Sequence, residues 1–328
     1  MSGTILKRGR FFAALASALV LLVLAAGVGV YLRGGWYALQ FAFLPGSSLW
    51  LPVANDDPRL SPSMRLALRP DPPKASAGQF VWQDVGVGFE VGELPVTADE
   101  QEVDRLLLAR INPARYRFLV RNAPGRDRKL DGWMTQLGAA LVVNGSYFTR
   151  DGLPETPIVS GGIRLGPVAY KATHGAFVVS GESASIRDLR DESWEDALQN
   201  ADEAIVSYPL LLSPDGPTRV KADRRWLANR SFVGEDDAGE IVIGTTSDAF
   251  FSLDRFAEFL RDAPLHLKFA LNLDGGSIAC QAVAVNAYRR DFCGQWESNV
   301  QHDQLKLLAP VVGHRRWGLP NVLAAVAR

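Results

Sequence analysis

The chain has 328 residues, of which 47% are hydrophobic and 22% are charged, and its 35 Lys and Arg residues balance 36 Asp and Glu residues. This composition is typical of a globular protein, and a chain of this length buries a core without needing a metal or disulfide framework. The balanced charge argues against a nucleic-acid-binding protein, and two cysteines exclude a disulfide-rich scaffold.

An uncharged apolar run at residues 11–32 follows a short basic segment that contains Lys7, Arg8 and Arg10. As a helix rising about 1.5 Å per residue, the run spans roughly 33 Å, enough to cross a bilayer. The cations predict a cytoplasmic tail at 1–10, a single-pass signal anchor at 11–32 and an extracytoplasmic remainder, which is periplasmic in a Gram-negative bacterium. A cleaved signal peptide is the alternative, although its apolar region is usually only about 7–15 residues long.

Residues 33–78 are predicted to connect the membrane segment to the main domain. Residues 33–54 are apolar and aromatic but interrupted by glycine and proline, and five prolines follow between positions 58 and 73. This composition is typical of a membrane-proximal arm followed by a linker. We therefore expect a single main domain at 79–328, beginning at Gln79.

Strand-like and helical patterns mix within the main domain. Apolar residues between Leu130 and Leu137 have the i, i+3, i+4, i+7 spacing of an amphipathic helix, which Gly138 would end. Ser252 can cap a second helix with the same periodicity at 253–263. Together with apolar runs typical of strands, these patterns predict an α+β, or mixed α/β, fold with a β-sheet core flanked by helices.

Three local patterns predict connections. Thr97 and Glu100 have the spacing of a capping box, which predicts a short helical turn. Two strand-like runs flank Asn112 and Pro113 and predict either a β-hairpin or successive strands. A third pair of runs, at 231–246, surrounds the sequence EDDAG and predicts a hairpin.

A polar pair marks the end of the strand-like run in FALNLDGGSIACQ. Because side chains alternate in a strand, Asn272 and Asp274 share one face and the leucines take the other. Gly275 and Gly276 permit a tight turn, whose amide N–H groups can bind an anion beside the Ser277 hydroxyl. The pattern indicates either an ordinary hydrogen-bonded strand end or a site that combines an acid, an amide and an anion cradle.

A second polar pair, Asn144 and Gly145, ends the apolar run in LVVNGSYF. Asn-Gly between apolar runs is typical of a type I′ hairpin turn. The alternative is that Asn144 serves a site as a hydrogen-bonding group at a strand end. Asn144 and Asn229 also begin glycosylation sequons, although the end of an apolar strand is a poor place for a glycan.

His174 and Arg230 are further candidates, each with an ordinary alternative. Histidine transfers protons readily near neutral pH, and the guanidinium fork of arginine suits a phosphate. Alternatively, His174 is structural and Arg230 is a surface arginine. The four histidines are scattered without HExxH spacing, so we predict no metal site, and neither a GxSxG nor a GxGxxG motif is present.

The two cysteines are placed so that a hairpin would pair them. A hairpin centred on Asn286 and Ala287 puts Cys280 opposite Cys293, because both lie equally far from the centre. We therefore predict a disulfide between them, with two free buried thiols as the alternative. A disulfide would fit an oxidising, extracytoplasmic compartment.

Taken in order, these motifs resemble the phosphodiester glycosidase family. Landmarks of the family are an apolar strand ending in Asn-Gly-x-Phe-Phe, an Arg-led hairpin, a helix, and Asn-Leu-Asp-Gly-Gly-Gly-Ser. This chain has NGSYF at 144–148, Arg230 before its hairpin, a helix at 252–263 and NLDGGSIA at 272–279. The third glycine of the last motif is missing, so Ser277 lies one position early, and Arg-Ser replaces the family's Arg-Thr.

The resemblance covers roughly residues 100–328 and implies roles for the singled-out residues. Asp274 is expected to act as acid/base or nucleophile, with His174 as the second proton-transfer group. The phosphate is expected at Arg230 and the glycine amides, and the asparagines are expected to orient Asp274 and the sugar. The expected substrate-binding residues are Asn144, Gly145, Arg230, Asn272, Gly275, Gly276 and Ser277.

The resemblance and the N-terminal segment together predict an extracytoplasmic hydrolase that cleaves a glycosyl phosphodiester. Its expected partners are a glycosyl phosphodiester or polysaccharide substrate, in envelope or exopolysaccharide processing, and the membrane that holds its N-terminal helix. No cofactor and no nucleic-acid partner are expected. The alternative is a non-catalytic, membrane-anchored module that binds a glycan or phosphosugar. The two differ in whether a second proton-transfer group lies within reach of Asp274.

Overall fold

The computed structural model describes residues 14–29, 31–32, 48–125, 128–149, 151–214, 219–221, 226–310 and 316–328. The chain divides into two compact units. The first comprises Met1–Leu51 and Leu308–Arg315, and the second comprises Pro52–Leu307 and Arg316–Arg328. The second unit contains every candidate site residue predicted from the sequence.

In the first unit, residues 14–29 are helical and their leucine and valine side chains are exposed. Within the described ranges, no helix combines the length and the apolar character needed to span a membrane. The predicted anchor also includes residues 11–13 and 30, which lie outside the described residues, as do the predicted tail at 1–10 and the part of the arm at 33–47. The anchor therefore stays a prediction.

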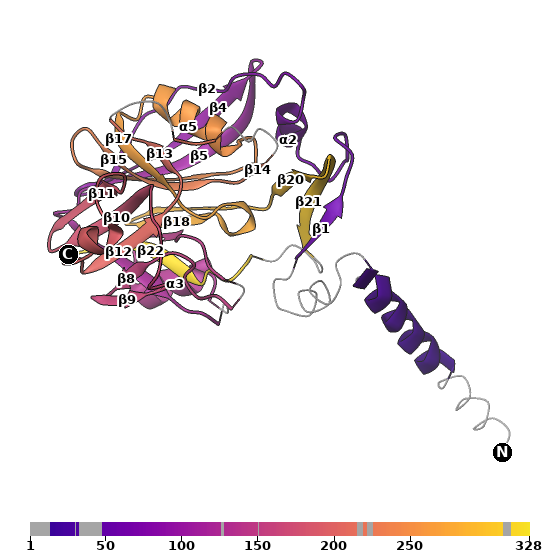
Figure 1. The fold of residues 1–328 in the computed structure, drawn as a ribbon. Coiled ribbons are helices and arrows are strands. Elements are labelled where there is room, and N and C mark those ends of the chain that lie inside the picture. Colours follow the sequence, from indigo (N-terminus) through magenta and orange to yellow (C-terminus); the bar gives the residue numbers. More distant parts are fainter. Residues whose placement is uncertain are drawn as a thin grey trace. The chain divides into compact units, whose positions relative to one another are not determined.

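Mostly antiparallel β-sheets and few helices make up the described structure, which confirms the mixed composition of the fold (Figure 1). The largest sheet has the order β13 (Leu210–Leu212), β17 (Leu267–Asn272), β15 (Ser231–Asp236), β16 (Ile241–Thr246), β5 (Gln101–Ile111), β4 (Phe89–Ala98) and β2 (Ser76–Ala77), and β3 (Gln83–Gly86) also pairs with β4.

Three smaller sheets complete the topology. One has the order β19 (Tyr288–Cys293), β18 (Cys280–Val285), β7 (Leu141–Asn144), β22 (Asn321–Ala327) and β6 (Tyr116–Asn122). Another has the order β11 (Ser183–Asp188), β10 (Gly175–Ser180), β12 (Glu203–Ser207), β8 (Ile158–Ser160) and β9 (Ile163–Leu165). The last has the order β1 (Ser48–Pro52), β21 (Gln304–Pro310), β20 (Glu297–Gln301) and β14 (Leu227–Ala228).

The helices cover the outer faces of two sheets. Helix α5 (Leu253–Asp262) packs against β13 and β2, and α3 (Leu130–Leu137) packs against β7 and β18 (Figure 1). The remaining helices are α2 (Pro62–Ala67), α4 (Trp194–Ala197) and the 3₁₀ helix η1 (Gly276–Ile278). Both amphipathic helices predicted from apolar spacing are confirmed, and Gly138 ends α3 in the left-handed conformation, with φ 56°.

A shared hydrophobic core joins the inner faces of the three larger sheets. Phe89 of β4, Phe118 of β6 and Phe177 of β10 are all buried in it. Phe118 and Phe177 meet edge to face, with ring centroids 5.5 Å apart. This packing brings strand ends from separate sheets to one place, where the candidate site lies.

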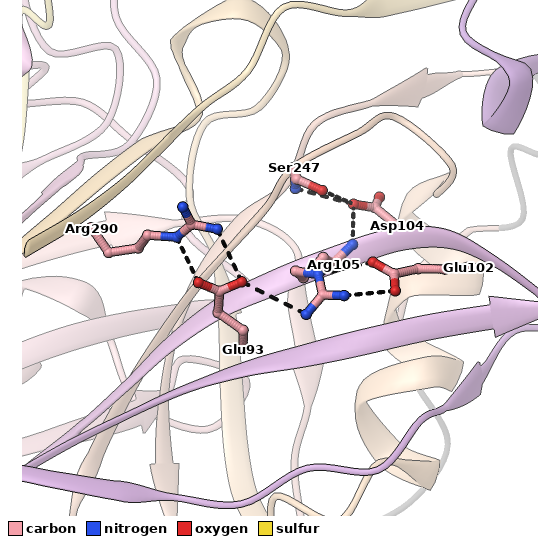
Figure 2. A network of polar contacts seen from close by, with 6 residues as sticks. All are labelled: Glu93, Glu102, Asp104, Arg105, Ser247 and Arg290. Atoms are coloured by element: carbon pink, nitrogen blue, oxygen red, sulfur yellow. Dashed lines mark hydrogen bonds and ion pairs between the residues drawn. The ribbon is translucent and has the colours of Figure 1, made fainter.

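Charged side chains also link the largest sheet to the β18–β19 hairpin (Figure 2). Glu93 of β4 accepts hydrogen bonds from Arg290 of β19 at 2.6 and 3.1 Å, and it forms an ion pair with Arg105 of β5 at 3.7 Å. Next to Arg105, the buried Asp104 accepts a hydrogen bond from the Ser247 amide. Partly exposed pairs of this kind contribute little each, so the network positions the hairpin more than it stabilises the fold.

The three predicted connections have different outcomes. The helical turn expected from Thr97 and Glu100 is wrong, because Asp99 and Glu100 have φ of 49° and 61° and form the tight turn between β4 and β5. The runs around Asn112 are successive strands, since β5 and β6 pair in different sheets. The hairpin predicted at 231–246 is confirmed by the pairing of β15 with β16.

Part of the predicted linker belongs to the compact second unit. Ser61 accepts a hydrogen bond from the Met64 amide and caps α2. Leu60 and Met64 are fully buried in the core beneath α5, and Ser76 pairs with Thr97. The high proline content of this segment predicted a linker, so the hydrophobic packing that begins before Gln79 was not predicted.

The predicted disulfide is present between Cys280 and Cys293, which face each other in the β18–β19 register. The bridge closes a loop with a sequence separation of 13 residues. In the chain-entropy model, a disulfide that closes such a loop stabilises the folded state by about 3 kcal/mol, because the cross-link restricts the unfolded chain.

We expect the double variant Cys280→Ser, Cys293→Ser to unfold at a lower temperature than the wild-type protein, because its unfolded state gains entropy. Thermal unfolding followed by circular dichroism measures the difference. Reductant should lower the melting temperature of the wild type and leave that of the double variant unchanged. A wild-type melting temperature insensitive to reductant, with a mass showing free thiols, would contradict the assignment.

Candidate active site

Asp274 lies just beyond β17, where two distant segments are joined by hydrogen bonds. Its amide donates to the main-chain oxygen of Gly145 at 3.0 Å, and the Nδ2 atom of Asn144 donates to the main-chain oxygen of Asp274 at 2.7 Å. The Oδ1 atom of Asn144 accepts from the amide of Cys280 at 3.1 Å. Asn144 thus ties the end of β7 to both ends of the glycine-containing turn.

The alternatives for Asn144 and Gly145 can now be decided. Asn144 is fully buried, so it is no glycosylation site, and β7 continues into no hairpin with the segment that follows it. Gly145 is required by packing, because a Cβ atom there would lie 2.3 Å from Oδ1 of Asn321. The pair therefore ends a strand and positions Asp274.

The Asp274 carboxyl group has an unusual protonation equilibrium. Burial raises its pKa to about 8, and the neighbouring Glu297 acts in the same direction. A hydrogen bond from the Gly275 amide to Oδ1, at 2.8 Å, and the charge of Arg230 oppose this rise. At neutral pH the group is therefore mostly protonated, which suits a general acid.

Glu297, the first residue of β20, is a second carboxylate beside Asp274 that the sequence analysis did not single out. Burial also raises its pKa, against the opposing effects of Trp226 and Arg230. Trp226 Nε1 donates to its Oε1 atom at 3.0 Å. A lone glutamate in GQWESN carries no motif signal, so only the pairing of β20 in the tertiary structure reveals it.

Arg230 is buried, with 5% of its surface exposed, and lies just before β15. Its side chain donates to the main-chain oxygens of Trp226 at 2.8 Å and Phe251 at 3.3 Å. No ion pair within the described ranges includes it. Burial lowers its pKa, and the acidic groups around it, Glu297 and Asp274 among them, act in the opposite direction. A buried guanidinium without a paired carboxylate is suited to bind an anion.

The two glycines after Asp274 have a packing role. The Gly275 amide donates to Asp274, and the Gly276 amide donates to the main-chain oxygen of Asn229 at 2.9 Å. A Cβ atom would lie 2.9 Å from the Asn229 oxygen at position 275 and 2.2 Å from Glu297 Oε2 at position 276. Neither amide is free to cradle a phosphate in this conformation, so Arg230 is the remaining candidate for binding an anion. Ser277 follows in η1 and is half-buried.

Asn229 holds the second side of the site. Its Nδ2 atom donates to the main-chain oxygens of Thr246 and Asp248, both at 3.1 Å, and its Oδ1 atom accepts from the amides of Gln295 and Trp296. Asn229 is fully buried, which excludes its sequon as a glycan site. This one amide therefore positions both Arg230 and the strand that carries Glu297.

Asn272 orients two tyrosines as well as ending β17. Its Nδ2 atom donates to the Tyr147 hydroxyl at 2.8 Å and to the main-chain oxygen of Tyr208 at 3.2 Å. The Tyr147 hydroxyl donates to the same Tyr208 oxygen at 2.7 Å. Tyr147 was visible inside the NGSYF motif, whereas nothing in the sequence pointed to Tyr208.

His174 lies beside this cluster, with its ring centroid 6.4 Å from that of Tyr208. Its Nδ1 atom accepts a hydrogen bond from the Leu210 amide at 3.2 Å. Burial and Arg219 lower its pKa, and Asp188 opposes them. Glu297 and Glu155 are the acidic groups that raise the pKa of Asp274, and His174 is not among the groups that shift it. The role of His174 as second proton-transfer group stays a prediction.

Metal ligands are not gathered here: within the described ranges, no three His, Cys, Asp or Glu side chains lie close enough to hold a metal ion. The site consists instead of two carboxyl groups, a buried guanidinium and buried amides. Such a set can transfer protons and bind an anion.

Comparison with known proteins accounts for this arrangement. The sequence model of the phosphodiester glycosidase family matches residues 137–305, which is more than half of the chain and includes Asn144, Arg230, Asp274 and Glu297. The chain belongs to the phosphodiester glycosidase family. No curated protein sequence matches this family member.

Solved structures share low sequence identity with this phosphodiester glycosidase. A hypothetical protein from Synechocystis has 16% sequence identity to this chain and a TM-score of 0.46. The match covers 74% of this chain and 62% of the Synechocystis protein, so this chain spans less than two thirds of that protein. The catalytic domain of zebrafish N-acetylglucosamine-1-phosphodiester alpha-N-acetylglucosaminidase, auto-inhibited by its pro-peptide, has 16% identity and a TM-score of 0.46, over 86% and 88%. A Burkholderia pseudomallei protein has 10% identity and a TM-score of 0.42, over 85% and 99%.

The raised pKa of Asp274 predicts a pH-dependent stability. The folded state binds this proton more tightly than the unfolded state, whose pKa is near 3.8, so stability is lost as pH rises toward about 8. We expect the melting temperature of Asp274→Asn to exceed that of the wild type by an amount that grows between pH 5 and pH 8. Melting curves of both proteins at each pH measure this difference, and a constant difference would show that Asp274 has an ordinary pKa.

Proposed function

We propose that this chain is a hydrolase that cleaves a glycosyl phosphodiester between the anomeric carbon and the phosphate oxygen. The observation that carries the proposal is that Arg230 is buried, forms no ion pair within the described residues and lies beside two carboxyl groups, one of which is protonated at neutral pH. Membership of the phosphodiester glycosidase family supports the same reaction class.

In the proposed mechanism, Arg230 binds the phosphate of the substrate. A phosphodiester is an anion, so a neutral Asp274 avoids the repulsion that a second ionised carboxylate would exert on it. Asp274 donates its proton to the departing phosphate oxygen as the bond to the anomeric carbon breaks. Glu297 takes a proton from the water whose oxygen bonds to that carbon, so that protons and atoms balance.

The asparagines act through other groups in this scheme. Asn144 holds the main chain of Asp274, and Asn229 holds Arg230 and the strand that begins at Glu297. Both side chains are buried, and a buried amide that loses its partners leaves donors and acceptors unsatisfied. They therefore keep the acid, the base and the guanidinium in a fixed arrangement.

We expect Asp274→Asn and Glu297→Gln each to lower kcat on a sugar-1-phosphate diester by about 10²–10⁴-fold, because each removes a proton-transfer group. Release of sugar and phosphomonoester by the purified full-length chain measures turnover. Glu258→Gln is the matched control, because Glu258 is exposed on α5.

Full turnover by Asp274→Asn would refute the assignment of this residue. If the wild-type protein binds a sugar 1-phosphate but cleaves no diester, the chain is instead the non-catalytic binding module. Binding that is lost in Arg230→Ala would still place the phosphate at the guanidinium.

The protonation of Asp274 also predicts the pH profile. Because a general acid must be protonated, we expect kcat/KM to fall as pH rises through about 8, the pKa of Asp274. Initial rates measured over a series of pH values at constant ionic strength test this decrease in kcat/KM. Glu258→Gln should retain it, and a profile that stays level through this range would exclude Asp274 as the acid.

We further propose that the enzyme works outside the cytoplasm, on an envelope polysaccharide or exopolysaccharide. The Cys280–Cys293 disulfide supports an oxidising compartment, and the apolar run at 11–32 supports a single-pass anchor. Protease protection of the main domain in intact cells, compared with lysed cells, tests the location. Recovery of the protein in the soluble cytoplasmic fraction would overturn it.

A further inference from the structure

An exposed aromatic surface lies next to Asp274 and is not used by the mechanism above. Tyr208 is 37% exposed, and its ring stacks on that of Tyr147 with centroids 4.3 Å apart and an angle of 25° between the planes. An aromatic ring that is supported from below and exposed to solvent is a typical contact for the apolar face of a sugar.

Hydrogen bonds hold this pair rigidly. The Tyr147 hydroxyl donates to the main-chain oxygen of Tyr208, and Asn272 donates to both that oxygen and the hydroxyl. Beneath them, hydroxyl groups link three segments: Ser146 donates to Ser207 at 2.9 Å, and Ser207 donates to the main-chain oxygen of Asn272 at 2.6 Å. The surface is therefore preorganised before any ligand binds.

Acidic groups lie around this aromatic surface. Glu155, Tyr170 and Asp274 all act on the pKa of Tyr208, which burial raises to about 12. Glu155 is exposed, its amide donates to the main-chain oxygen of Tyr147 at 3.0 Å, and its charge also acts on Asp274. The guanidinium of Arg230 donates to the main-chain oxygens of Trp226 and Phe251, whereas Tyr208 is held through Asn272 and Tyr147, so different segments hold the two groups.

We propose that Tyr208, stacked on Tyr147, is the platform on which the sugar ring of the substrate lies, with Glu155 accepting a hydrogen bond from a sugar hydroxyl. This inference rests on the proposed function for the position of the phosphate at Arg230. Glu155 adjoins the platform, because its amide donates to the main-chain oxygen of Tyr147, and its carboxyl group is exposed. A neutral sugar is therefore favoured over a uronic acid, whose carboxylate Glu155 would repel.

Kinetics of the full-length protein on a neutral sugar-1-phosphate diester test the platform. We expect Tyr208→Ala to raise KM by about tenfold, the factor that corresponds to the upper end of a ring-stacking energy, with a smaller change in kcat. Tyr208→Phe is the matched control and should keep the wild-type KM, because it retains the ring. Circular dichroism and melting temperature confirm that the variants are folded.

A second arm compares a neutral sugar with the corresponding uronic acid. The wild type should prefer the neutral substrate, and Glu155→Gln should narrow this preference by raising kcat/KM for the uronic acid. An unchanged KM in Tyr208→Ala, while the wild type turns over, overturns the platform and leaves the proposed function standing. An unchanged preference in Glu155→Gln overturns the role of Glu155.

If no turnover is found, calorimetry that measures binding of a neutral sugar 1-phosphate separates the platform proposal from the proposed hydrolase function. Binding that weakens in Tyr208→Ala but not in Tyr208→Phe supports the platform and counts against the hydrolase function. Equal binding by all three proteins overturns the platform. Failure of the wild type both to bind this ligand and to cleave the diester overturns both proposals.

Discussion

The buried side-chain amide of Asn144 is the contact on which the rest of the site depends. It donates to the main-chain oxygen of Asp274 and accepts from the amide of Cys280, so one side chain connects three segments. Buried donors and acceptors must be paired, because each unpaired one costs about 1–3 kcal/mol. The same requirement, met by Asn229 on the other side, keeps Arg230 and the first residue of β20 near Asp274.

These constraints hold three ionisable groups together, of which Arg230 is buried and Asp274 and Glu297 are half-buried. Burial raises the pKa of both carboxyl groups, but Asp274 is the one that is mostly protonated at neutral pH, and Arg230 forms no ion pair within the described residues. Charges that are removed from water are stable only when they are paired or neutralised. A protonated Asp274 is neutral, and the opposite charges of Arg230 and Glu297 attract each other across the site.

Local patterns in the sequence predicted the elements that depend on near neighbours. Helices α3 and α5 follow from apolar periodicity, and the disulfide follows from the register of a hairpin whose partners are 13 residues apart. The turn at Asp99 and Glu100 was missed because capping-box spacing also occurs where two strands reverse direction. The extent of the main domain was missed because the burial of Leu60 and Met64 depends on distant strands and on α5.

For the site, the sequence by itself singled out Asp274, Arg230 and Asn144 as candidates, because these residues stand in short motifs at strand ends, and the resemblance to the family supplied their expected roles. Only the tertiary structure decided that the glycine amides are already bonded, that Glu297 is the second carboxylate, and that Tyr208 lies exposed beside Asp274. The physical reason is that these contacts join residues from separate sheets. Asn144 and Asp274 are 130 positions apart, and no periodicity within a strand or helix encodes which strand ends will meet.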